Sequence, residues 1–362
     1  MSKIYSLPEI QSKPLLTPEE LTRELPLSAE GKEFVEESRR TIAEILEGKD
    51  KRKLIIAGPC SIHDITAAKE FADKFAELSD QVSDQFFMIM RAYFEKPRTV
   101  FGWQGIMHDP LLDGSGEIGI GLTWTRELLL ELTRRKIPIA SEILGPLSPL
   151  YFDDLISWGC IGARTSSSQP HRQIASTLNF PVGFKNNTDG NIKIAIDGIR
   201  AASVSQTFLG INAAGRPTKI QSSGNARAHL VLRGGENEPN YHPSDIAHAL
   251  SHLKECNLSN AIIVDCSHDN SGRVHKKQTQ VFHEVMRQIL LGNHSIRGMI
   301  LESHLFSGNQ SLDKHPSELK YGVSVTDPCL DFSTTERLIR WAAVKLQEPK
   351  SNEIPLTSTI SF

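Results

Sequence analysis

Eight short apolar segments of this chain each end at a side chain that could bind an anion or a metal. In chain order these side chains are Cys60, Arg91, Glu142, Arg164, Lys185, Arg233, His268 and Glu302. Any one of them has an ordinary explanation, because an arginine after a strand is usually solvated. Eight in succession do not, because burying unpaired charge is costly. We therefore interpret the set as a functional site.

The basic members of this set predict an anion-binding site. Together with two cations that follow the second segment they are Arg91, Lys96, Arg98, Arg164, Lys185 and Arg233. If these side chains converge, their mutual repulsion is tolerable only where a polyanion usually sits among them. Arginine in particular suits bidentate binding of phosphate or carboxylate.

The remaining members predict a metal site. Cys60, His268 and Glu302, with Asp327 from a later loop, form a mixed sulfur, nitrogen and oxygen ligand set. That mixture suits a divalent transition metal (Mn, Fe, Co or Zn) better than Ca or Mg. A structural zinc site more often has closely spaced cysteine and histidine pairs, whereas these residues follow separate segments, as expected of a catalytic metal.

These residues can meet only if the segments that carry them end at one place. The segments span 53–60, 86–93, 137–144, 159–165, 180–186, 228–235, 261–268 and 297–303, and helical patterns separate most of them. Near-continuous apolar strands alternating with helices predict a (β/α)8 TIM barrel, whose catalytic groups come from the carboxyl ends of its strands. We expect a single domain that covers residues 1–362, in which the barrel spans residues 53–345.

Two parts of the chain fall outside this alternation. Residues 1–50 have charged, amphipathic helical patterns, with a helix start at Thr17 to Glu20 and a stop at Gly48, which predict an N-terminal helical extension with a regulatory or oligomerisation role. Residues 203–225 contain two short strand patterns around a turn. They predict a β-hairpin inserted before the sixth barrel strand.

The composition gives no sign of nucleic-acid or membrane binding. The chain of 362 residues has 40 basic and 43 acidic side chains, a formal charge of -3, and 39% hydrophobic residues. The five cysteines are odd in number and form no CxxC, and the amino-terminal residues have no apolar leader pattern. We therefore expect a reduced, cytoplasmic protein, in which a disulfide at Cys60 is disfavoured.

Two other motif matches carry little weight. The sequence GSGEIG (114–119) fits GxGxxG, but it follows a turn-rich stretch rather than a strand. The sequence HEVMR (283–287) begins like HExxH and lacks the second histidine. Both are better explained as loop and helix surface.

Seven stretches in matching order resemble the type I 3-deoxy-D-arabino-heptulosonate 7-phosphate (DAHP) synthases. They are GPCSIHD (58–64), MRAYFEKPRT (90–99), IGART (161–165), PVGFKN (181–186), LRGG (232–235), ESH (302–304) and GVSVTDPC (322–329). The likeness extends from about Leu16 to about Ala343. It implies a (β/α)8 barrel and a transferase that condenses phosphoenolpyruvate with erythrose 4-phosphate and water, the first step of the shikimate pathway to aromatic amino acids.

The resemblance also implies a role for each matching residue. It makes Cys60, His268, Glu302 and Asp327 ligands of a divalent metal that polarises the aldehyde. It assigns phosphoenolpyruvate to Arg91, Lys96, Ala163, Arg164, Lys185 and Arg233, with Glu142 orienting a water. It assigns erythrose 4-phosphate to Lys96, Pro97, Arg98 and Thr99. We count Cys60, His268 and Lys96 as catalytic, with Lys96 as the hypothetical proton donor to the aldehyde.

Many members of this family are inhibited by an aromatic amino acid, at segments that here read SPLY (148–151) and TLNFP (177–181). The resemblance therefore makes Pro149, Leu150 and Asn179 the candidate effector residues. Several motifs look most like the tyrosine-sensitive isozymes, so tyrosine is the favoured effector, and we expect a homodimer or homotetramer.

Three positions depart from the family pattern. Asn187 and Asp269 stand where glycine is usual, and Ser167 stands where a glutamate is usual, beside Arg164. Asparagine and aspartate tolerate a left-handed backbone better than other non-glycine residues, so both are compatible with such a conformation and we expect the loops to be preserved. The missing carboxylate at Ser167 could change the phosphate pocket.

Two alternative functions are disfavoured. The related synthase of KDO 8-phosphate uses the same enol donor, but it typically carries KANR where this chain has KPRT (96–99). A catalytically inactive barrel that senses amino acids would be expected to lose metal ligands or basic residues, and this chain keeps them all.

Overall fold

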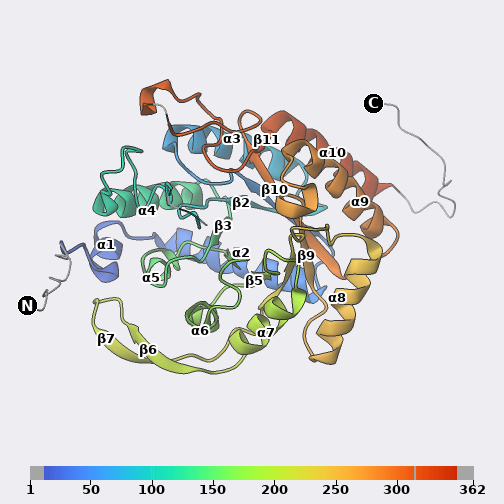
Figure 1. The fold of residues 1–362 in the computed structure, drawn as a ribbon, viewed down its shortest axis with the longest axis horizontal. Helices are drawn as coiled ribbons and strands as arrows, with labels where there is room; N and C mark the ends of the chain where they lie inside the picture. The colour runs from blue at the N-terminus through green and yellow to red at the C-terminus, as the bar shows by residue number, and fades with distance from the viewer. Residues whose placement is uncertain (1–11, 99, 101, 314, 349–362) are drawn as a thin grey trace, which may run out of the picture.

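A closed barrel of parallel strands organises the computed structural model, which describes residues 12–98, 100, 102–313 and 315–348 (Figure 1). The barrel strands pair in the order β1-β2-β3-β4-β5-β8-β9-β10, and β10 pairs back onto β1 through residues such as Met299 and Ile55. Their bounds are β1 (Lys53–Gly58), β2 (Phe86–Arg91), β3 (Ile139–Glu142), β4 (Trp158–Ile161), β5 (Val182–Lys185), β8 (His229–Leu232), β9 (Ile262–Asp265) and β10 (Ile296–His304). The (β/α)8 barrel is thus confirmed.

Helices connect most of these strands, because parallel neighbours need a crossover. Figure 1 shows several of them packed around the barrel. Their bounds are α3 (Ile65–Gln81), α4 (Ile118–Arg134), α5 (Ser148–Phe152), α6 (Gln169–Thr177), α7 (Ile192–Ala202), α8 (Pro243–Glu255), α9 (Gln278–Leu290) and α10 (Phe332–Gln347). Short elements complete the loops: the 3-10 helices η1 (His268–Ser271), η2 (His275–Lys277) and η3 (Pro316–Glu318), and strand β11 (Leu330–Asp331).

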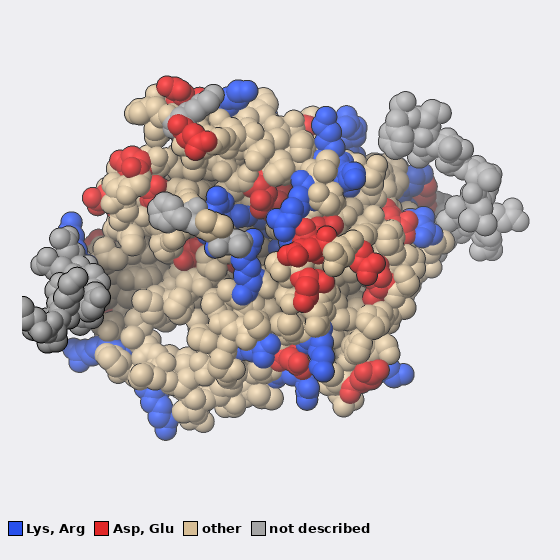
Figure 2. Space-filling view, in the orientation of Figure 1, with Lys and Arg blue, Asp and Glu red and all other residues tan. Residues whose placement is uncertain are grey.

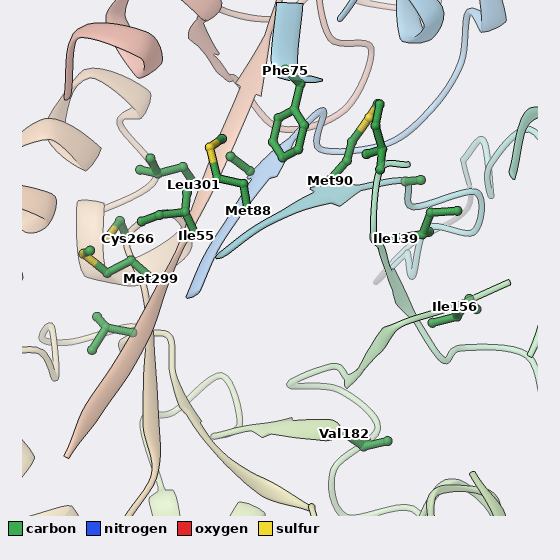
Figure 3. Close-up of a cluster of buried hydrophobic side chains, with 14 of the residues drawn as sticks. Ile55, Phe75, Met88, Met90, Ile139, Ile156, Val182, Cys266, Met299 and Leu301 are labelled. Atoms are coloured by element: carbon green, nitrogen blue, oxygen red, sulfur yellow. The ribbon is translucent and has the colours of Figure 1, made fainter. Parts of the chain in front are cut away.

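Strand β1 shows how the apolar segments fill two separate cores. Ile55 and Ala57 belong to the large cluster between the strands and the helices, part of which Figure 3 draws. Leu54 and Ile56 belong to a smaller cluster in which residues of β1, β2, β4, β8, β9 and β10 meet. Because successive side chains of a strand point to opposite faces, a strand buried on both faces must be apolar throughout.

The N-terminal extension forms two helices, α1 (Pro18–Glu24) and α2 (Ala29–Glu47). The expected start is a capping box, in which Thr17 and Glu20 bond each other's backbone N–H, and the expected stop at Gly48 has a φ of 78°. From α2, Ile42, Ile45 and Leu46 join the smaller cluster with Leu54 and Ile56 of β1. Helix α2 therefore packs against the apolar interior of the barrel.

The inserted hairpin consists of β6 (Thr207–Ile211) and β7 (Pro217–Gln221), paired antiparallel. It extends away from the barrel toward α1 (Figure 1). The backbone N–H of Glu19 donates to the carbonyl of Ala213 at the hairpin tip, at 2.9 Å. The hairpin and the extension are therefore in direct contact.

Within the described part of the chain, no helix combines the length and the apolar character that crossing a bilayer requires.

Candidate active site

The turn after β1 presents Cys60 at the carboxyl end of the barrel. A side chain at Gly58 would place its Cβ 2.7 Å from the carbonyl oxygen of Arg91, so only glycine permits this approach of β1 to β2. The backbone N–H of Ile62 then donates to the carbonyl of Tyr93 at 2.9 Å and holds the turn in place. Cys60 itself is fully buried.

Three of the four predicted metal ligands lie together. One donor atom each of Cys60, Glu302 and Asp327 lies within 4.8 Å of the others. The ammonium of Lys96 sits among them, with Nζ 2.7 Å from Cys60 Sγ and 3.1 Å from Asp327 Oδ2. The Cys60 sulfur and the two carboxylates form a donor set that fits a divalent transition metal. The residues present therefore suit the metal that the resemblance implies.

The fourth predicted ligand, His268, lies at the edge of this group. Its Nε2 is 3.7 Å from Oε1 of Glu302, while its Nδ1 is 2.9 Å from Oδ2 of Asp265. A carboxylate on Nδ1 leaves Nε2 as the atom that can face a metal. His268 is the first residue of η1 and has a left-handed backbone, with a φ of 53°.

Charge and burial set the protonation of these groups. Burial, followed by the charge of Glu302, raises the pKa of the Cys60 thiol well above its usual value. The Lys96 ammonium holds the pKa of Asp327 far below its usual range. Burial disfavours the charge on Lys96, but Cys60 and Asp327 outweigh it and raise the pKa of that amine. A metal that binds here must therefore displace a proton from Cys60.

The predicted cations divide into a buried and an exposed group. Arg91, Lys96, Lys185 and Arg233 are all less than a tenth exposed, whereas Arg98 and Arg164 are exposed. Figure 2 shows lysine and arginine side chains beside acidic ones near the middle of the face in view. The barrel thus brings four buried cations, from the ends of β2, β5 and β8 and the loop after β2, to its carboxyl end.

Each of these four buried cations pairs with a carboxylate, and the sequence predicted none of the four pairs. Arg91 pairs with Glu302 at 3.0 Å, and Lys96 with Asp327. Lys185 pairs with Asp265 at 2.7 Å, and Arg233 pairs with Asp269. Asp265 is the last residue of β9 and reads in the sequence as part of an apolar segment. The i, i+3 spacing of Asp265 and His268 was the signal that could have identified it.

The remaining predicted substrate residues occupy two loops. Glu142 ends β3 and is buried, and its carboxylate contacts the place that a Cβ of Gly162 would fill, just before Ala163 and Arg164. Pro97 is half-buried, between Lys96 and the exposed Arg98. Thr99 lies outside the described residues. The neighbouring Glu95 is buried and accepts from Gly145 N–H at 3.3 Å, which ties this loop to the loop after β3.

The two glycine replacements do not use a left-handed backbone. Neither Asn187 nor Asp269 has a positive φ, whereas His268, Gly272 and Arg273 of the second loop do. The loops accommodate both residues because the side chains make local bonds. Asn187 Oδ1 accepts from the N–H of Asn191 at 2.9 Å, and Asp269 pairs with Arg233 and Arg273. Ser167 is exposed.

The candidate effector residues lie on the side of the barrel that carries the N-terminal extension. Pro149 is buried and Leu150 half-buried in α5, whereas Asn179 is exposed before β5. Arg39 of α2 bridges the two regions, because its Nη1 donates to Asn179 Oδ1 at 2.9 Å and its Nη2 donates to the carbonyl of Asp153.

Comparisons with known proteins relate this chain to one enzyme family. The model of the DAHP synthetase I family matches residues 25–340. A tyrosine-sensitive phospho-2-dehydro-3-deoxyheptonate aldolase of Escherichia coli is 47% identical over 326 residues, which are 90% of this chain and 91% of that protein. A tryptophan-sensitive one from the same organism is 45% identical over 94% of this chain and 97% of its own length. A solved aldolase of this name from Francisella tularensis superimposes with a TM-score of 0.90 at 40% identity, covering 93% of this chain and 98% of that structure.

Proposed function

The chain belongs to the DAHP synthetase I family, and on that premise we propose how its own residues carry out the reaction of a DAHP synthase. The enzyme condenses phosphoenolpyruvate with erythrose 4-phosphate and water to give DAHP and phosphate, the first step of aromatic amino-acid biosynthesis. One observation carries the assignment of residues. The buried cations and the Cys60, Glu302 and Asp327 cluster share the carboxyl end of one barrel.

The cations hold two substrates that would otherwise repel each other. We assign phosphoenolpyruvate to the buried Arg91, Lys185 and Arg233, together with Arg164 and the adjacent Ala163. We assign erythrose 4-phosphate to Pro97, Arg98 and Thr99, and Lys96 is shared between the two substrates. The contribution of these residues is proximity and electrostatic stabilisation of the charged reactants.

Cys60, His268, Glu302 and Asp327 would hold a divalent metal, for which we propose Mn, Fe, Co or Zn. Such a metal, when bound, polarises the aldehyde oxygen of erythrose 4-phosphate as a Lewis acid. The enol carbon of phosphoenolpyruvate attacks the aldehyde carbon, and Lys96 donates a proton to the aldehyde oxygen. Glu142 orients the water that adds to C2, and phosphate then leaves by cleavage of its C–O bond.

Lys96 can act as the donor because its amine is protonated at neutral pH, where neighbouring negative charge keeps its pKa raised. The ammonium also lies beside two of the proposed metal ligands. A proton held there is next to the place where the aldehyde oxygen would be polarised.

We also propose that an aromatic amino acid regulates the enzyme, with tyrosine favoured and Pro149, Leu150 and Asn179 as contact residues. The relatives are named for sensitivity to tyrosine or tryptophan. Residues 1–50 and the hairpin over 203–225 would carry regulation or assembly into a homodimer or homotetramer, around a catalytic barrel over 53–345. Five unpaired cysteines support a reduced, cytoplasmic setting.

The test is an assay of phosphoenolpyruvate consumption by the metal-loaded protein. We expect turnover with erythrose 4-phosphate, one phosphate released per phosphoenolpyruvate, and no turnover with arabinose 5-phosphate, the acceptor of the KDO 8-phosphate reaction. Turnover with arabinose 5-phosphate alone would contradict the proposal. Adding tyrosine, phenylalanine and tryptophan one at a time tests regulation in the same assay.

A further inference from the structure

Asp269 already binds part of the Arg233 guanidinium, which we assign to phosphoenolpyruvate binding. Asp269 forms an ion pair with Nη1 of Arg233, and the two side chains are only 7% and 4% exposed. Nε of the same guanidinium is buried and has no hydrogen-bond partner among the described residues. Arg233 therefore offers an incoming anion only the part of its donor fork that Asp269 does not use.

Backbone contacts hold the two side chains next to each other. The N–H of Asn270 donates to the carbonyl of Arg233 at 3.1 Å, and the side-chain amide of Asn270 donates to the carbonyl of Leu232. Gly234, at a φ of 82°, allows this close approach of the strand end to η1. These bonds fix the backbone of Asp269 beside Arg233, so a bound anion and the Asp269 carboxylate lie next to the same guanidinium.

A second cation compensates Asp269 only in part. Arg273 Nε donates to Asp269 Oδ1 at 2.8 Å, but the Arg273 side chain is 52% exposed. Solvent screens an ion pair at such a position, whereas the buried pair with Arg233 is screened much less. The carboxylate of Asp269 therefore interacts more strongly with Arg233 than with Arg273.

Building on the assignment of Arg233 to phosphoenolpyruvate, we propose that Asp269 is a specificity-determining residue that competes with phosphoenolpyruvate for Arg233 and lowers the affinity of the enzyme for that substrate. A like charge next to a bound anion in a buried site opposes binding. Asp269 also orders the Arg233 side chain, which favours binding, but Asn186 already orders its backbone by accepting from Arg233 N–H at 2.9 Å. Repulsion therefore outweighs the benefit of ordering one side chain.

This competition distinguishes the chain from relatives that have glycine at the position of Asp269. Without a side chain there, Arg233 would present its whole fork to the substrate. The effect concerns phosphoenolpyruvate alone, because erythrose 4-phosphate is assigned to the loop of Pro97 and Arg98. The chain should need a higher phosphoenolpyruvate concentration than its Asp269→Gly variant.

Steady-state kinetics of metal-loaded Asp269→Gly and Asp269→Asn test the proposal. We expect the KM for phosphoenolpyruvate to fall about tenfold in Asp269→Gly and by a smaller factor in Asp269→Asn. The kcat and the KM for erythrose 4-phosphate should stay within about twofold, since the lost interaction concerns binding of one substrate. Arg273→Gln should raise the KM for phosphoenolpyruvate, because Asp269 then neutralises Arg233 alone.

Asp50→Asn is the matched control. Asp50 also pairs with an arginine, Arg52, but before β1, at the opposite end of the barrel, so its kinetic constants should equal those of the wild type. A higher or unchanged KM for phosphoenolpyruvate in both Asp269 variants would overturn the proposal, and would mean that Asp269 orients Arg233 or is a bystander. If Asp269→Gly does not fold, as judged by thermal unfolding, Asp269→Asn decides alone, because it keeps the shape of the side chain and removes its charge.

Arg233→Ala separates failure of this inference from failure of the assignment on which it rests. A higher KM for phosphoenolpyruvate in Arg233→Ala, without a lower one in the Asp269 variants, overturns the competition and keeps the assignment. An unchanged KM in Arg233→Ala overturns both.

Discussion

Nδ1 of His268 lies 2.9 Å from Oδ2 of Asp265, a carboxylate with no exposed surface. The same oxygen accepts from Lys185 Nζ at 2.7 Å, and Oδ1 accepts from the N–H of Ser267 at 3.0 Å. Burial disfavours the charge of Asp265, but His268 and Lys185 outweigh it and keep the pKa of this carboxyl well below its usual value. One buried charge thus orients a proposed metal ligand and a proposed substrate cation together.

Replacing that charge should weaken both functions. In Asp265→Asn an amide cannot accept from His268 and Lys185 in the same way, so we expect metal affinity to fall about 10- to 100-fold and the KM for phosphoenolpyruvate to rise. Metal affinity is measured by competition with a chelator, without substrate. Asp197→Asn on α7, whose side chain is 41% exposed, is the control. Wild-type metal affinity in Asp265→Asn would show that Asp265 is not needed to orient His268, whose Nδ1 also lies 2.7 Å from Ser267 Oγ.

Removing the proposed thiolate ligand should separate metal binding from folding. We expect Cys60→Ala to fold, because it loses a single buried sulfur atom, and to lose metal binding and metal-dependent turnover. Cys160→Ala is the control, since Cys160 is equally buried in the smaller cluster and is not a proposed ligand. Both variants are compared by thermal unfolding and by metal titration. A Cys60→Ala protein that still binds metal and turns over substrate would refute the ligand assignment.

Lys96→Met should lose turnover while it keeps metal binding. Loss of the proton donor should reduce turnover about 10²- to 10⁴-fold. Metal affinity should be kept or increased, because the ammonium no longer neutralises Cys60 and Asp327. The two quantities are measured on the same metal-loaded sample. Full turnover in Lys96→Met would exclude Lys96 as the donor.

The fold itself should lose stability in acid through His229. Trp158 Nε1 donates to His229 Nε2 at 3.1 Å, and burial lowers the pKa of His229 from 6.5 to about 4. The unfolded chain binds this proton below pH 6.5 and the folded chain only near pH 4, so the free energy of unfolding falls as the pH drops between these values. The loss amounts to about 3 kcal/mol.

Urea unfolding of the wild type and of His229→Gln at pH 7.5 and pH 5 measures this contribution. The variant should be less stable than the wild type at pH 7.5, because it loses packing, and the difference should shrink at pH 5. An identical difference at both pH values would mean that His229 does not titrate on unfolding.

The barrel and most of its strand-end residues were predictable because they depend on local patterns. Each barrel strand is buried on both faces and is therefore a continuous apolar run, and its last residue necessarily faces one rim. The helix start at Thr17 and the stop at Gly48 follow from capping chemistry, which is also local.

The counterions of the site were not predictable in the same way. Asp265 belongs to an apolar strand and Asp269 to a turn, and nothing nearby in the sequence identifies Lys185 or Arg233 as their partners. Those pairs depend on the register of β5, β8 and β9, which only the closed barrel defines.

Condensation should depend on a metal that Cys60 holds at the carboxyl end of the barrel, beside the substrate cations. The direct test is the rate of phosphoenolpyruvate loss with erythrose 4-phosphate, measured after chelation and after adding back Mn, Fe, Co and Zn singly to the wild type and to Cys60→Ala. We predict no turnover after chelation, recovery in the wild type with at least one of these metals, and no recovery in Cys60→Ala. Full turnover by the chelated wild-type protein, or equal recovery in both proteins, would contradict it.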